Sequence, residues 1–350
     1  MGDMGGRQSK RGSVLWKLLG AVILALVLAS ALGYTWERYG AARDFERLPM
    51  PGTLVSVGTH RLHLHCVGEG SPTVLLESGW AMPAAIWIRT QPLLAKSSRT
   101  CAYDRAGYGW SESGPAPRTA SQVAEEAEAM LRSAGIDGPL ILVGHSYGGL
   151  CMRLLAKRIP DRVVGMVLVD AVQEDMLRIL PMIKQRMEEK RGQMEAAPYL
   201  AAFGLFRIAP AYFGLDRRGE EFDALSDAQW ETLRTFRAMP RQVESALAEL
   251  MLFEASMDEA RAAGSFGHLP LVIVSAGLEK KPRWVPDDYS DAEYLRLWDG
   301  LQENLRSLTY PRAERRIASK SGHEIPVQEP EILAAAVDEV RPEAFTRAGQ

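Results

Sequence analysis

A serine between glycines carries the strongest chemical signal in this chain. Ser146 lies in the sequence Val-Gly-His-Ser-Tyr-Gly-Gly, after an apolar run and before a segment of helical composition. A G-x-S-x-G pattern between a strand and a helix is typical of a sharp turn that exposes the serine hydroxyl. The N-terminus of the following helix favours negative charge at that point. We therefore predict that Ser146 is a nucleophile.

A serine hydroxyl becomes a strong nucleophile only when a base removes its proton. Among the six histidines, His323 follows the last strand-like run, at the sheet edge where α/β proteins place their chemistry. His145 points away from its neighbour on such a turn, and we interpret it as a structural hydrogen-bonding residue. His63 and His65 alternate along one strand with no third or fourth ligand in view, which favours a polar strand face over a metal site. We predict no metal and no cofactor.

A carboxylate must orient the histidine, and two backbone N–H groups must hold the oxyanion. Asp170 ends the run VVGMVLVD and is our first candidate for the acid, whereas Glu279 follows the run LPLVIVSAG and is the alternative. The sequence leaves this choice open. The N–H of Tyr147, directly after the serine, and that of Trp80, after the run PTVLLES, are the candidate oxyanion donors.

Apolar runs alternate with helical segments, which predicts an α/β fold with a mostly parallel sheet and helices on both faces. A helix is predicted over residues 119–134 with Ser121 as its N-cap. Residues 171–267 contain no convincing strand and are rich in Met, so we predict a helical insertion there. The strand-like runs are residues 53–58, 61–68, 72–78, 100–105, 139–146, 163–170, 269–277 and 313–319.

Across about residues 53–345 the chain resembles the α/β-hydrolase superfamily, in particular its serine esterases and lipases. The motifs LLESGW, CAYDRAGYGWSESG, LVGHSYGG, VLVD and SGHEIPVQEP carry this resemblance. It implies a core of residues 53–170 and 268–350, with 171–267 as a helical cap over the active site. Most members carry the acid in a G-x-x-D pattern, which in this chain reads Gly277-Leu278-Glu279-Lys280, and some carry it where this chain has Asp170.

The resemblance also implies that the strand ending at Cys66 lies antiparallel to the strand beginning at Cys101. These two cysteines would then form a disulfide outside the cytoplasm, or remain two unpaired core thiols. Cys151 would be buried and free on the helix after the nucleophile. The three cysteines show no spacing typical of a zinc site.

The N-terminal segment is first basic and then apolar. Arg7, Lys10, Arg11 and Lys17 precede 19 uncharged residues, 18–36, which as a helix would span about 28 Å, close to the hydrocarbon core of a bilayer. The basic end is expected to stay cytoplasmic, with the remaining chain outside. Residues 1–37 are predicted to be a lead and transmembrane anchor, followed by a charged tether at 38–52. The alternative is a signal peptide cleaved near residues 29–31, which would give a secreted protein.

These features predict a membrane-tethered serine hydrolase that cleaves a carboxylic ester through an acyl-enzyme. The Met-rich insertion indicates a small-molecule substrate with a hydrophobic part. An amidase, lactonase or acyltransferase on the same fold is the alternative, followed by a non-catalytic binding protein. The formal net charge of −3 gives no support to nucleic-acid binding.

Overall fold

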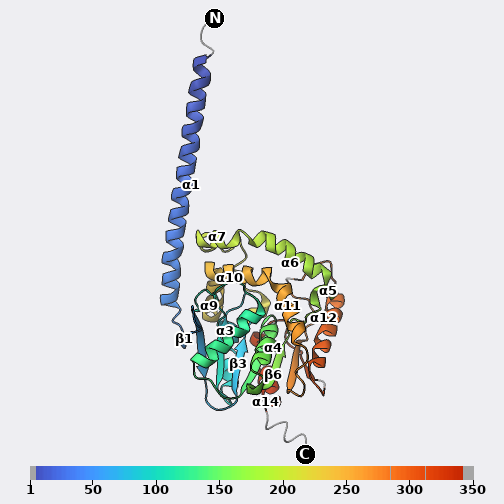
Figure 1. The fold of residues 1–350 in the computed structure, drawn as a ribbon. Helices are drawn as coiled ribbons and strands as arrows, with labels where there is room; N and C mark the ends of the chain where they lie inside the picture. Colours follow the sequence, from blue (N-terminus) through green and yellow to red (C-terminus); the bar gives the residue numbers. More distant parts are fainter. Residues whose placement is uncertain (1–4, 284, 312, 342–350) are drawn as a thin grey trace, which may run out of the picture.

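The computed structural model describes residues 5–283, 285–311 and 313–341 and shows one eight-stranded sheet (Figure 1). The strand order is β1-β2-β4-β3-β5-β6-β7-β8. The pairs β1–β2 and β2–β4 are antiparallel, and all the other neighbours are parallel. The strands are β1 (Thr53–Ser56), β2 (Arg61–Val67), β3 (Thr73–Glu77), β4 (Thr100–Tyr103), β5 (Leu140–His145), β6 (Val163–Val169), β7 (Leu271–Ala276) and β8 (Glu314–Ala318). The predicted mostly parallel sheet is confirmed.

Helices cover both faces of this sheet. One apolar cluster joins the sheet to α3 (Ala120–Ser133), α4 (Gly148–Arg158), α11 (Phe253–Ala263) and α12 (Asp291–Leu305). A second cluster joins the other face to α2 (Gln91–Leu94), α13 (Ile325–Gln328) and α14 (Pro330–Glu339). The central strands β3 and β5 are buried along their whole length, as expected for parallel strands that are covered on both faces.

Two local features differ from the sequence prediction. The N-cap of α3 is Thr119, not Ser121, because Thr119 has the extended backbone of a cap and its hydroxyl accepts the N–H of Gln122 at 3.4 Å. Helix α12 was not anticipated. Ser290 caps it by accepting the N–H of Glu293 at 3.2 Å, which is half of a capping box.

The predicted helical insertion lies between β6 and β7, and the described residues of this segment contain no strand. Its helices are α5 (Met176–Ile179), α6 (Pro181–Met194), α7 (Ala197–Ala202), α8 (Leu205–Ile208), α9 (Asp227–Ala238), α10 (Pro240–Met251) and α11. Helices α6, α7 and α10 lie across one end of the sheet in Figure 1, whereas α11 returns to pack on α3 and α4. We call residues 171–252 the cap.

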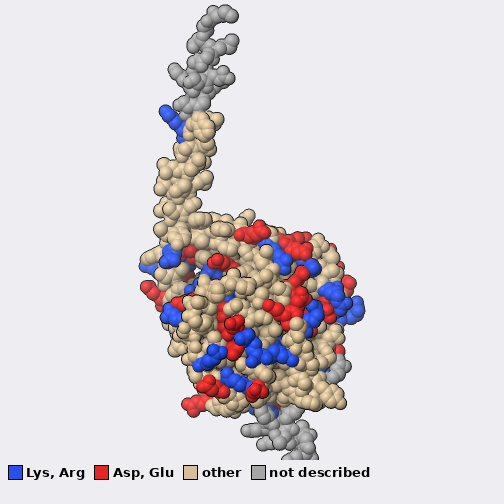
Figure 2. Space-filling model, viewed as in Figure 1, with Lys and Arg blue, Asp and Glu red and all other residues tan. Residues whose placement is uncertain are grey.

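The N-terminal helix α1 (Gly5–Arg47) projects from this body (Figure 1). Its part from Leu15 onward is long and apolar enough to cross a membrane, and the projecting surface carries few charges (Figure 2). The segment expected as a tether is helical up to Arg47. Two carboxylates of α1 explain this, because Glu37 and Asp44 pair with Arg207 of α8 at 3.0 and 2.8 Å and fix the end of the helix to the cap.

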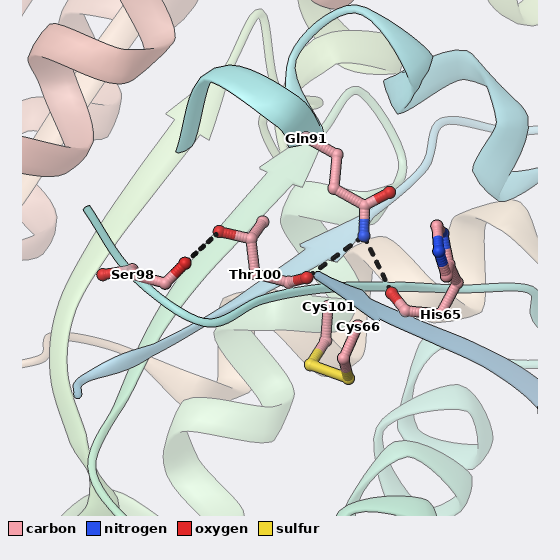
Figure 3. The surroundings of a disulfide bond; sticks show 6 residues. All are labelled: His65, Cys66, Gln91, Ser98, Thr100 and Cys101. Carbon is pink, nitrogen blue, oxygen red and sulfur yellow. Dashed lines mark hydrogen bonds between the residues drawn. A yellow bond between two sulfur atoms is a disulfide. The ribbon is translucent and has the colours of Figure 1, made fainter. Parts of the chain in front are cut away.

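A disulfide joins β2 to β4 (Figure 3). Cys66 and Cys101 are directly opposite in the antiparallel register, with Cα atoms 4.0 Å apart. The side-chain amide of Gln91 donates to the carbonyl oxygens of His65 and Thr100 on these same two strands, at 2.8 and 3.1 Å. Cys151 is buried with a free thiol. The disulfide therefore links β2 covalently to β4, where the antiparallel part of the sheet meets the parallel part.

Candidate active site

The turn between β5 and α4 holds Ser146 in a strained backbone conformation with φ 53°. Only small neighbours fit this turn. A Cβ at Gly144 would lie 2.6 Å from the carbonyl oxygen of Gly148, and a Cβ at Gly148 would lie 2.6 Å from that of Glu77. A non-glycine residue held at positive φ is uncommon and clusters at functional sites. The G-x-S-x-G pattern thus produces the sharp turn that the sequence predicted.

His323 and Asp170 form a hydrogen-bonded pair. His323 Nδ1 lies 2.7 Å from Asp170 Oδ2, while Asp170 Oδ1 accepts the Trp298 indole N–H at 2.9 Å and the Ala276 N–H at 3.1 Å. Asp170 is only 2% exposed. Burial raises its pKa, but the hydrogen bond and charge of His323 together with the hydrogen bonds from Trp298 and Ala276 act in the opposite direction, and the pKa of Asp170 is lowered.

The same hydrogen-bonded pair raises the pKa of the histidine. Burial lowers the pKa of His323, but the hydrogen bond and charge of Asp170 are stronger, and the pKa is raised above its ordinary value. The alternative acid Glu279 is exposed. Within the described chain it makes no hydrogen bond or ion pair. The geometry therefore brings Asp170, and not Glu279, to His323.

His145 holds the histidine loop against the nucleophile turn. Its Nε2 lies 2.8 Å from the carbonyl oxygen of His323, and the two rings are 4.8 Å apart. Burial, followed by the charge of His323, lowers the pKa of His145 to about 3. The ring is therefore neutral and donates its Nε2–H to that carbonyl, because a carbonyl can only accept. The predicted structural role of His145 is confirmed.

The loop after β3 passes directly over Ser146. A Cβ placed at Gly79 would lie 3.2 Å from the Cβ of Ser146, and Ala81 adopts φ 59° two residues later. The backbone N–H groups of Trp80 and Tyr147 donate no hydrogen bond within the described residues. Both are thus available to an oxygen bound beside the serine. The Trp80 indole N–H donates to the Ala246 carbonyl of α10 at 2.8 Å and ties this loop to the cap.

A buried ionic network supports this loop from below. Arg105 donates to Glu77 at 2.5 Å, to Glu249 of α10 at 2.9 Å, and to the carbonyl oxygen of Gly79 at 2.9 Å. Tyr108 donates to Glu249 at 2.7 Å. Burial raises the pKa of Glu77 to about 7 against the opposing charge of Arg105. The network therefore couples the core, the loop and the cap.

Ser146 and His323 open into a cavity of about 400 Å³ between core and cap. One part of its wall is apolar and consists of Met176, Ile183, Met187, Leu250 and Phe253. The remaining wall carries several basic side chains from the cap. The cavity is large enough for a small organic molecule.

Sequence analysis located most of this site but missed Trp298, the second hydrogen-bond donor to Asp170. The Ser290–Glu293 capping signal could have located its helix, although not the direction of its indole. His63 lies elsewhere and is buried, with Nδ1 2.8 Å from Asp104 and Nε2 against the carbonyl oxygen of Pro51. It is a buried core residue, because the side chains of Asp104 and Trp110 and the carbonyl of Pro51 surround its ring.

Comparison with known proteins supports this interpretation. A family model of the α/β hydrolase fold matches residues 72–228. An AB hydrolase superfamily protein of Gibberella zeae is 39% identical over 109 residues, covering 29% of this chain and 33% of that protein. An uncharacterized vacuolar membrane protein of Saccharomyces cerevisiae is 35% identical over 147 residues, covering 35% of this chain and 23% of that protein. The chain thus spans a third or less of these curated relatives.

Solved structures show the same architecture. A thermophilic esterase from Thermogutta terrifontis superposes with a TM-score of 0.57 at 20% identity, covering 82% of this chain and 96% of the esterase. At this identity the likeness shows the fold alone. The matching family model, the strand order and the strained serine turn agree with one another, and the chain has the α/β-hydrolase fold.

Proposed function

We propose that this protein is a serine hydrolase that cleaves a carboxylic ester, with Ser146, His323 and Asp170 as its catalytic triad. The observation that carries the proposal is the 2.7 Å contact between His323 Nδ1 and Asp170 Oδ2, beside a serine on a strained turn in the same cavity. An ordinary glycine-serine loop would need neither the strain nor the paired histidine.

In the proposed mechanism Ser146 attacks the ester carbonyl while the Nε2 atom of His323 takes the serine proton. Asp170 fixes the ring through Nδ1 and stabilises the imidazolium. The N–H groups of Trp80 and Tyr147 stabilise the oxyanion. The alcohol leaves after it receives the proton from His323, and an acyl-serine remains. Water activated by His323 then releases the acid and restores the hydroxyl.

We further propose that α1 anchors the enzyme in a membrane with the catalytic domain outside the cytoplasm. Three observations support this. The helix continues through residues 29–31 into the domain, which favours an anchor over a cleaved signal peptide. Basic residues precede the apolar segment. The Cys66–Cys101 disulfide is typical of an oxidising compartment.

The cap side beside α1 is itself apolar. A Cβ at Gly33 of α1 would lie 2.4 Å from the carbonyl oxygen of Phe203, so the two segments touch. Figure 1 shows α7 on the side of the body from which α1 projects. Exposed apolar side chains here favour contact with the membrane surface. They are Tyr199, Phe203, Leu205, Ile208 and Tyr212, with Ile208 65% and Tyr212 86% exposed.

The test of the hydrolase proposal is labelling by a fluorophosphonate, combined with hydrolysis of 4-nitrophenyl esters from acetate to palmitate. The full chain in nonionic detergent is compared with Ser146→Ala and with Ser121→Ala, a control on the exterior of α3. Ser146→Ala should lose labelling and lower kcat by about 10⁴-fold or more, whereas Ser121→Ala should match wild type. A wild-type protein that is neither labelled nor active on any ester would overturn the proposal.

A further inference from the structure

Five basic side chains line the active-site cavity: Arg186 and Lys190 of α6, Arg217, Arg237 of α9, and Arg283. We call these residues the cation cluster. Arg186 pairs with Glu189 at 3.2 Å. The other four make no hydrogen bond or ion pair with any residue in the described part of the chain. Four of the five come from the cap, so the cluster forms only when the cap covers the core.

Two carboxylates share the cavity and offset part of the charge of the cluster: burial lowers the pKa of Arg237, and the charges of Glu324 and Glu221 act against that shift. Glu221 and Glu324 lie in the same lining, and neither comes within 4 Å of a basic group among the described residues. Glu324 is buried, and its Oε2 atom has no hydrogen-bond partner. Burial raises the pKa of Glu324, against the opposing charges of His323 and Arg237. The cap contributes four basic side chains and one carboxylate, Glu221, to the lining, so positive charge is in excess on the cap side of the cavity.

The cluster lies near the reacting groups. The Lys190 ammonium is 4.8 Å from the ring centre of Trp80, the residue that precedes Ala81 on the oxyanion loop. Although part of the Lys190 side chain is exposed, burial of its ammonium lowers its pKa, and the charges of Arg237 and Arg186 lower it further. These three cations are thus close enough to repel one another.

Arg237 is half-buried and the other four cations are exposed, so an uncharged ligand that covered them would remove their water without replacing it, and this weakens its binding. An anion in the same place would remove the repulsion and form charge-assisted hydrogen bonds. The apolar wall beside the cluster, with Met176, Met187 and Phe253, would pack against a hydrocarbon segment. The cavity therefore fits a molecule with an apolar middle and a negative end.

We propose that the ester substrate carries an anionic group, such as a carboxylate, phosphate or sulfate, which binds the cation cluster while the ester carbonyl lies at Ser146. This inference rests on the proposed hydrolase function and adds the charge of the substrate to it. Lys190 and Arg237 are the residues that select for the anion. They act on substrate binding and take no part in proton transfer.

The experiment compares two esters of equal shape and different charge. Mono-4-nitrophenyl adipate ends in a carboxylate, and 4-nitrophenyl 6-methylheptanoate ends in an isopropyl group of similar size. The full chain in nonionic detergent should hydrolyse the adipate ester with a kcat/KM at least tenfold higher. This preference should fall as sodium chloride is raised, because salt screens the attraction.

Single substitutions test whether Lys190 and Arg237 cause the preference for the adipate ester. Lys190→Met and Arg237→Met should each lower the ratio of the two kcat/KM values by about tenfold, which is about 1.4 kcal/mol of discrimination. Lys184→Met is the matched control, since Lys184 is also on α6 but pairs with Glu254 at 3.2 Å and lies outside the cavity lining. It should leave the ratio at the wild-type value.

The outcomes separate this inference from the proposed function. Equal kcat/KM values for the two esters in wild type, with Ser146 labelled by fluorophosphonate, would overturn the anion site and leave the hydrolase standing. If no ester is hydrolysed, adipate is titrated calorimetrically into Ser146→Ala. Binding that Lys190→Met weakens about tenfold supports the anion site without catalysis, whereas no binding overturns it.

Discussion

The core wall of the cavity holds its buried acid, Asp170, in hydrogen bonds, whereas two cations of the cap wall make no hydrogen bond or ion pair with any described residue. On the core side Asp170 accepts hydrogen bonds from His323, Trp298 and the backbone of Ala276. On the cap side Lys190 and Arg237 have no hydrogen-bonded partner among the described residues. Under the proposed function, this difference assigns different roles to the two walls. The core would supply the preorganised groups for the chemistry on the acyl group, and the cap would select the substrate.

The strongest test of the core wall is the choice of acid. Asp170→Asn should lower kcat/KM by about 10⁴-fold, because an amide can hold His323 in the wrong tautomer and cannot stabilise the imidazolium. Glu279→Gln is the matched control and should change kcat/KM by less than about twofold, since Glu279 is exposed. Ester hydrolysis measures both, and a large loss in Glu279→Gln would reverse the assignment.

The junction between the two walls should show the next largest effect. Glu249→Gln removes the charge that Arg105 and Tyr108 share across the core–cap boundary. Because one partner of a buried pair is lost, unfolding in urea should show a destabilisation of about 3–5 kcal/mol. Glu259→Gln makes the same chemical change on α11, where a backbone N–H of Ser121 is the partner. It should cost less than about 1 kcal/mol.

The disulfide tests whether the core can be weakened without changing selectivity. Replacing both Cys66 and Cys101 with Ala should lower the free energy of unfolding by about 3–4 kcal/mol, because the 35-residue loop is no longer closed in the unfolded chain. The preference between the two esters should stay at the wild-type value. Reductant should lower the urea midpoint of the wild-type protein and leave that of the double variant unchanged. A wild-type midpoint that is the same with and without reductant would argue against the disulfide.

The pH profile reports the charges that face His323. Activity needs the neutral ring, so kcat/KM should rise with pH through the pKa of His323, which is raised above its usual value of about 6.5. Glu324 contributes to this rise through its charge. In Glu324→Gln the rise of kcat/KM with pH should therefore occur at a lower pH, by less than about one unit. Glu331 is exposed in the first turn of α14, and Glu331→Gln should leave the pH at which kcat/KM rises unchanged.

The smallest expected effect concerns the outer face of the cap. A nitroxide on Tyr212→Cys, reconstituted with the full chain in a bilayer, should collide more with oxygen than with a water-soluble nickel complex. The same label on Tyr310→Cys, an equally exposed tyrosine of the core at 73%, should show the reverse. Two identical accessibility profiles would argue against a cap that rests on the membrane.

The sequence by itself determined the local parts of this protein. Most strands could be located because they are short apolar runs between turn residues, and β2 could be located because its apolar and polar residues alternate. The serine turn could be located because the strained backbone at Ser146 admits only small neighbours, a constraint that involves only five consecutive residues. His323 was found for a related reason, since it follows the last strand at the carboxyl edge of the sheet.

Only the tertiary structure decided which distant groups meet. Asp170 and Glu279 both follow strands, and the choice depended on where β6 places its end relative to the loop of His323. Trp298 reaches Asp170 from a helix 128 residues away. The cation cluster combines α6, α9 and the loop after β7, which no spacing in the sequence brings together. Hydrogen bonds and charge repulsion act over a few ångströms in space, so the set of residues that line the cavity depends on the packing of the cap on the core.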